Sequence, residues 1–106
     1  EAAIDPAWAE GLARATPEDT LVSRVFSGRA GRSLATPYVL AATAANAPAP
    51  APYPVQRGLT GAMRRAAAGD LTRLQAWAGQ SAGMARAAPA GDIVRQAWDG
   101  ARELLA

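Results

Sequence analysis

Alanine dominates the hydrophobic residues of this sequence, and this limits what the chain can fold into. Half of its 106 residues are hydrophobic, and 29 of these are alanine, which leaves few large aliphatic or aromatic side chains. Alanine has the highest helix propensity, but a buried leucine or tryptophan contributes roughly 1.5–3 kcal/mol or more, which an alanine methyl cannot match. The composition therefore predicts a mostly α-helical chain whose helices pack against a larger body.

Helix start signals divide the chain into about five helical segments. Asp5 and Thr36 are N-cap residues placed directly before proline, the residue favoured at the first helical position. The pair Gly69-Asp70 predicts the end of one helix and the cap of the next. The expected helices cover residues 6–15, 38–45, 55–68 and 71–78, and the segment that Pro89 opens.

Residues 21–26 form the one convincing β-segment of the sequence. They read Leu-Val-Ser-Arg-Val-Phe, which combines β-branched and aromatic residues, and turn-forming residues follow at 27–32. A single strand cannot satisfy its own backbone hydrogen bonds. We therefore expect the partner strands to lie outside this chain or in a second copy of it, and the fragment to contain about five helices and one strand.

Charge and missing residue types exclude several classes of function. The net charge is only +2, and all eleven basic residues are arginines scattered among nine carboxylates, which disfavours a nucleic-acid interface. Without cysteine or histidine, the chain has no disulfide, no thiolate metal site and no histidine base. The start has neither signal-peptide features nor methionine, and no apolar run could span a bilayer, so we expect a cytoplasmic protein and a chain taken from a longer one.

Three blocks stand in a fixed order along the chain. Residues 20–32 end in Phe-Ser-Gly-Arg-Ala-Gly-Arg after the β-segment, and residues 51–56 read Ala-Pro-Tyr-Pro-Val-Gln. Residues 77–80 read Trp-Ala-Gly-Gln, with Ala-Pro-Ala at 88–90 and an apolar helix after it. In this order and spacing, the blocks resemble the C-terminal third of the nitronate monooxygenases, the 2-nitropropane dioxygenase-like enzymes.

The resemblance implies a parent α/β enzyme with an FMN-binding TIM-type barrel and a helical second domain. Residues 1–35 would form the end of the barrel, and residues 36–106 the helical subdomain and C-terminal helices. It also implies FMN as cofactor, an alkyl nitronate and O2 as substrates, and the remainder of the barrel as partner. That family uses a histidine base and phosphate loops ending in Gly-Thr-x-Phe. This chain contains neither, so we expect no catalytic residue and no activity in the 106 residues alone.

One motif of the family is only partly present. Some members carry Tyr-x-x-x-Tyr-x-x-x-Lys from the tyrosine of the Ala-Pro-Tyr segment onward, beside the active site. Here Tyr53 matches the first position, but Arg57 and Gly61 stand where the second tyrosine and the lysine would be. This departure indicates that the parent differs from that subgroup on its substrate side.

Six residues are candidates for contact with substrate or cofactor. The turn after the β-segment could offer backbone N–H groups and a guanidinium to an anion, and a tyrosine held between two prolines could line a pocket. An indole and an amide three residues apart would share one helical face. The simpler interpretations are a solvated turn, a tyrosine that packs the connector onto the body, and packing between domains. The candidates are Ser27, Gly28, Arg29, Tyr53, Trp77 and Gln80.

Two other functions are compatible with the residues. The chain could be a free-standing helical interaction module that docks through the apolar side of residues 98–105, without catalysis. It could also bind an anion or phosphate at Arg24, Arg29 and Arg32.

Overall fold

The first helix forms where the capping signals predict it. The structure is a computed structural model that describes residues 3–106, so the first two residues of the N-terminal sequence lie outside the described range. Helix α1 (Pro6–Arg14) begins after Asp5, whose carboxylate accepts the Ala7 backbone N–H at 2.8 Å. It ends at Ala15, which adopts an extended conformation ahead of the Thr16-Pro17 step.

A β-hairpin follows, and it corrects the expectation of a lone strand. After the 3₁₀ turn η1 (Pro17–Asp19), strand β1 (Thr20–Ser23) pairs antiparallel with β2 (Gly31–Leu34), and Thr20 lies opposite Leu34. The partner strand is therefore inside the chain. The sequence Gly-Arg-Ser-Leu has no β-branched residue, so only its pairing with β1 makes it a strand.

The segment predicted as one helix from residue 55 to 68 consists of two short ones. Helix α2 (Pro37–Ala42) is capped by Thr36, as expected, and α3 (Val55–Leu59) and α4 (Gly61–Ala66) follow the proline-rich connector. They are separated at Thr60, whose hydroxyl donates a 2.6 Å hydrogen bond to the carbonyl of Phe26. This long-range bond holds the junction of α3 and α4 against the turn between the strands.

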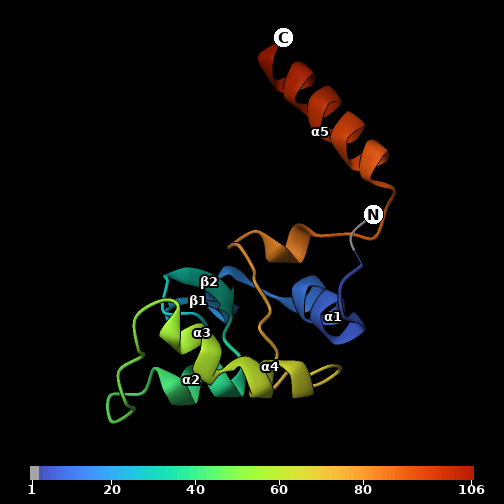
Figure 1. The fold of residues 1–106 in the computed structure, drawn as a ribbon. Helices are drawn as coiled ribbons and strands as arrows, with labels where there is room; N and C mark the ends of the chain where they lie inside the picture. The colour runs from blue at the N-terminus through green and yellow to red at the C-terminus, as the bar shows by residue number, and fades with distance from the viewer. Residues whose placement is uncertain (1–2) are drawn as a thin grey trace.

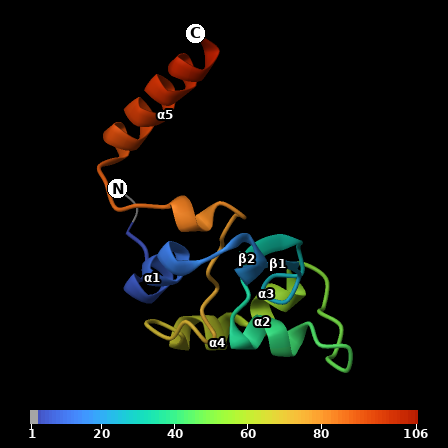
Figure 2. The same cartoon turned by 180° about the vertical axis from the view of Figure 1, so that it is seen from behind.

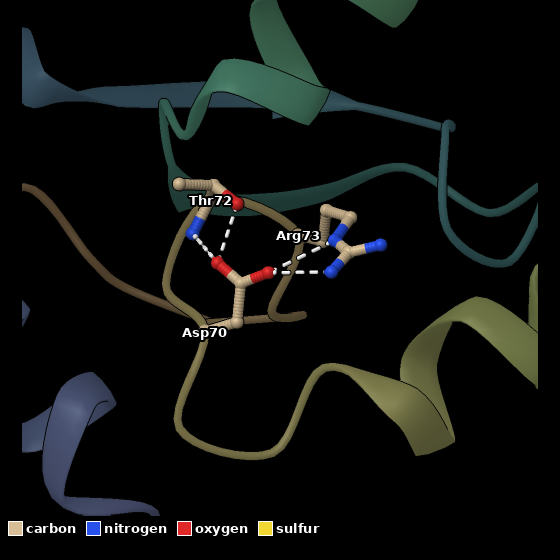
Figure 3. A network of polar contacts seen from close by, with 3 residues as sticks. All are labelled: Asp70, Thr72 and Arg73. Carbon is tan, nitrogen blue, oxygen red and sulfur yellow. Dashed lines mark hydrogen bonds and ion pairs between the residues drawn. The ribbon is translucent and has the colours of Figure 1, made fainter.

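The predicted helix over residues 71–78 is wrong. The Asp70 carboxylate accepts hydrogen bonds from the Thr72 backbone and hydroxyl and pairs with the Arg73 guanidinium, which closes a compact turn instead (Figure 3). The chain then runs extended along the free edge of β2. Leu34 donates to the Ala76 carbonyl at 2.9 Å, and Ala78 donates to the Arg32 carbonyl at 3.1 Å. Backbone pairing with β2 outcompetes the helical preference of this alanine-containing segment.

Two small clusters of buried side chains form the core of the body. The first contains Leu34 and the alanines of the edge segment, covered by α1, and the second contains Val25, Phe26 and Val39. In both views α2 and α4 lie below the hairpin and the segment of η2 (Ala82–Met84) lies above it (Figures 1 and 2). Thus Val25 and Phe26, expected as strand residues, instead leave β1 and fill the space between hairpin and helices.

Helix α5 (Ala90–Leu105) stands away from this body (Figures 1 and 2). It begins after Pro89, as predicted, and none of its residues is buried. Among residues 3–106, five α-helices and one two-stranded sheet are present, so the expectation of a mostly helical chain with about five helices is confirmed. None of the helices in this range has both the length and the hydropathy needed to cross a bilayer.

Candidate functional site

The turn between the two strands packs directly on the proline-rich connector. Gly28 has a φ of +89°, and a Cβ atom there would lie 2.4 Å from the Tyr53 backbone nitrogen and 2.7 Å from the Ala51 carbonyl oxygen. Only glycine combines this left-handed conformation with such a close approach. The structure therefore brings the predicted site residues Ser27, Gly28, Arg29 and Tyr53 together, although they are separated by more than twenty positions in the sequence.

Hydrogen bonds from α3 hold the connector in place. The Gln56 side chain accepts the Ala51 backbone N–H at 3.0 Å and donates to the Val25 carbonyl at 2.8 Å. Tyr38 of α2 also donates to that carbonyl at 3.1 Å, and burial raises the pKa of its phenol. Sequence reasoning did not single out Gln56 or Thr60 as positioning residues. Their positioning role leaves no local pattern, because each bonds to a carbonyl more than thirty positions away in the chain.

Arg29 lies on the ring of Tyr53. The guanidinium carbon is 4.1 Å from the ring centroid, within the range of a cation–π contact. Both residues are exposed, and 43% of the Tyr53 surface remains accessible. The pair thus presents a positive charge and an aromatic ring at the surface, on a backbone that is fixed from beneath.

Two backbone N–H groups of this turn, those of Gly28 and Arg29, are already engaged. Gly28 donates to the Arg24 carbonyl at 2.9 Å, and Arg29 donates to the Ser27 hydroxyl at 3.2 Å. The space beside Gly28 is filled by residues 51–53. A flavin phosphate needs several unpaired backbone donors around an open concavity, and the turn does not fit that group. Of the donors of Gly28 and Arg29, the guanidinium is the one that donates to no other described residue.

Trp77 and Gln80 do not share a helical face, because the segment that carries them is extended. Trp77 bridges to Ser33, packs on Gly31 and meets Phe26 edge to face with ring centroids 6.2 Å apart. Its carbonyl accepts the indole N–H of Trp8 at 3.0 Å, and 39% of its surface is accessible. Gln80 is exposed in the turn that follows. The structure therefore separates Gln80 from the Arg29–Tyr53 pair and places Trp77 on the hairpin.

Two open surface cavities lie away from the predicted site residues. One of about 520 Å³ lies between α1 and the connection from β2 to α2, and one of about 300 Å³ lies beside the connector. None of the six predicted residues lines either of them. Within residues 3–106 there is no cluster of three side chains suited to a metal ion. The chain also has no histidine, so the histidine base that the resemblance implies is not among these 106 residues.

Comparisons with known proteins show which enzymes this chain is similar to. The chain is 32% identical over 98 residues to the nitronate monooxygenase of Paraburkholderia phytofirmans, covering 91% of this chain and 27% of that protein. A probable nitronate monooxygenase of Staphylococcus aureus is 36% identical over 78 residues, covering 72% of this chain and 22% of that protein. No protein-family model matches the chain.

A solved structure agrees with these relatives. The crystal structure of nitroalkane oxidase from Streptomyces ansochromogenes superposes with a TM-score of 0.73 at 36% identity, covering 87% of this chain and 26% of that one. The chain therefore spans about a quarter of the length of the proteins it matches. These matches do not favour a free-standing interaction module. Sequence and fold together identify the chain as a nitronate monooxygenase-like segment.

Proposed function

We propose that this chain is the C-terminal part of an FMN-dependent nitronate monooxygenase that oxidises alkyl nitronates with O2. The observation that carries the proposal is the similarity over nine tenths of the chain to an enzyme of which the matched part is 27%. In this proposal residues 1–35 close the edge of the barrel, and residues 36–106 form the helical subdomain and the C-terminal helices. The chain supplies no histidine, so the catalytic base belongs to the rest of the polypeptide.

The exposed apolar side of α5 is evidence for a large protein partner. We propose that this partner is the remainder of the barrel. Val94 and Trp98 are 67% and 65% exposed, and Leu104 is 89% exposed. A contiguous apolar surface of this kind on a helix with no buried residue is typical of an interaction surface. Along the sequence, polar residues alternate with these apolar ones, and their side chains would stay in water. They are Arg95, Asp99 and Arg102.

FMN binding belongs to the rest of the enzyme in this proposal. Two amides of the turn at residues 27–29 have partners within the chain, and residues 51–53 fill the space beside Gly28, which supports a phosphate site elsewhere in the enzyme. We therefore expect the 106-residue chain to leave FMN fluorescence and absorbance unchanged in a titration. Binding at micromolar FMN would contradict this part of the proposal.

A chimeric enzyme tests the function itself. In the Paraburkholderia phytofirmans nitronate monooxygenase, the matching segment is replaced by this chain, and O2 uptake is measured with propyl-2-nitronate. We expect a folded flavoprotein that consumes O2 only with the nitronate. A chimera that binds FMN but shows no nitronate-dependent uptake would overturn the proposal. The proposed cytoplasmic location is checked separately, by fractionating the cells that produce the protein.

Matched variants of α5 test the partner within the same chimera. Trp98→Asp places a charge on the apolar side and should lower the yield of soluble flavin-loaded chimera, because it opposes docking of α5. Arg95→Gln changes the polar side and should leave the yield unchanged. In the isolated chain, both variants should melt like the parent, since α5 is not packed there. Equal yields for both chimeras would argue against docking through this side.

A further inference from the structure

We infer that the Arg29–Tyr53 pair is a binding site for a small planar oxyanion, of the nitronate or carboxylate type. The inference rests on the proposed function for the identity of its natural ligand. The charge of Arg29 meets the face of the Tyr53 ring at 4.1 Å. A cation–π contact consumes none of the five N–H donors of a guanidinium, which all point outward in its plane.

No protein group within the described part of the chain takes up these donors. The ion pairs of residues 3–106 join Arg14, Arg73 and Arg95 to carboxylates on their own segments, and none involves Arg29. The guanidinium of Arg29 also has no hydrogen bond to another described residue. Because the Tyr53 ring and not a carboxylate orients this exposed arginine, its guanidinium N–H groups can donate to a ligand.

The neighbouring arginines are engaged, which sets Arg29 apart from them. Arg24 donates to the Gly28 carbonyl at 3.1 Å, and Arg32 donates to the Thr20 hydroxyl at 3.0 Å and to the Thr20 carbonyl. The three arginines therefore do not converge on one phosphate. A single guanidinium presents two parallel N–H groups, which match two oxygens of one anion, and a nitronate or a carboxylate offers such a pair of oxygens.

The backbone beneath the pair is built to hold it in one position. Gly28 locks the turn onto residues 51–53, and Gln56 ties Ala51 and the Val25 carbonyl together. Pro52 and Pro54 flank Tyr53 and restrict its backbone. A donor that is held in advance loses less conformational entropy when the anion binds, so this arginine should bind more strongly than a mobile surface arginine.

Titration of the 106-residue chain followed by NMR tests the site directly. The Nε–H signal of Arg29 is monitored while propyl-2-nitronate, acetate or inorganic phosphate is added at constant ionic strength. We expect saturable shifts with nitronate and acetate. Arg29→Lys should bind these anions at least about threefold more weakly, because lysine keeps the charge but lacks the two parallel N–H groups of the guanidinium. Tyr53→Phe should bind like the parent, and Tyr53→Leu should bind more weakly. Arg86→Gln, at an exposed arginine outside the site, is the matched control and should change nothing.

Two results would overturn the inference: equal shifts at Arg29 and Arg86, or shifts at Arg29 that do not saturate with nitronate or acetate. The chimera then separates the two sources of the anion. If the substrate occupies the site, Arg29→Lys raises KM for the nitronate by about tenfold and leaves kcat within about twofold. If a carboxylate of the remaining polypeptide occupies it, KM is unchanged and the chimera unfolds at lower temperature. The NMR titration does not depend on chimera activity, so the inference and the proposed function can fail separately.

Discussion

The body, made of the hairpin and the helices packed on it, buries apolar side chains, whereas helix α5 leaves its apolar side chains exposed. Phe26 and Val39 at the centre of the body are at most 1% exposed, whereas none of the residues of α5 is buried. The radius of gyration of 16.0 Å exceeds the roughly 13 Å expected for a compact domain of this length, because α5 extends away. The comparison teaches that the body buries its own apolar side chains, while α5 has an apolar side that the described part of the chain leaves exposed.

The largest expected effect tests whether the body is a self-sufficient core. Phe26→Ala should lower the free energy of unfolding of the chain by about 3–5 kcal/mol, because it empties a packed aromatic site. The matched change Trp98→Ala in α5 should alter it by no more than about 0.5 kcal/mol. Urea denaturation followed by circular dichroism measures both. If the two variants lost similar amounts of unfolding free energy, the body and α5 would not differ in their contribution to stability.

The next effect concerns the contact that joins the turn to the connector. Gly28→Ala should destabilise the chain by about 3 kcal/mol or more, because a left-handed backbone and an overlap with the Tyr53 backbone act together. Gly69 also has a positive φ but has nothing near its Cβ position, so Gly69→Ala should cost only about 1–2 kcal/mol. Thermal melts of both variants check the difference, and equal melting temperatures would show that the close approach is absent in solution.

A smaller effect is expected at the junction of α3 and α4. Thr60→Val leaves the Phe26 carbonyl without its 2.6 Å donor and should cost about 1–3 kcal/mol. Thr43→Val removes an exposed hydroxyl that bonds only within its own helix, and should cost less than about 0.5 kcal/mol. Hydrogen exchange of the α3 amides should rise in the first variant alone. Unchanged exchange in Thr60→Val would show that this bond does not hold the helices.

The smallest expected effect is on the stability of the chain at acidic pH. Hydrogen bonds from Thr72 and then Arg73 lower the pKa of Asp70 below its ordinary value of 3.8 (Figure 3). Because the native pKa is depressed, the carboxylate contributes stability that is complete above pH 3.8 and is lost as the pH falls through the native pKa. Thr72→Val should move that pKa back toward 3.8, as measured by NMR titration of the Asp70 carboxyl carbon. A titration identical to that of the parent chain would contradict the arrangement of this turn.

Local signals predicted the helix starts but not the long-range pairings. Asp5, Thr36 and Pro89 begin helices as expected, because capping and the fixed φ of proline act within one turn. Strand β2 and the extended segment at 76–78 were missed, because each is stabilised by hydrogen bonds to a distant segment. The same limit applied to the site, where the motif residues were recognised but the Arg29–Tyr53 contact was not.

The sequence by itself determined where α1, α2 and α5 begin, which residues are too small to build a large core, and which family the ordered motifs resemble. These properties depend on neighbouring residues and on composition. Only the tertiary structure decided that the turn at Gly28 closes on the connector, that Trp77 lies on the hairpin and that α5 remains uncovered. Those outcomes depend on which distant backbone groups meet, and a hydrogen bond or steric contact between segments leaves no periodic pattern in either of them.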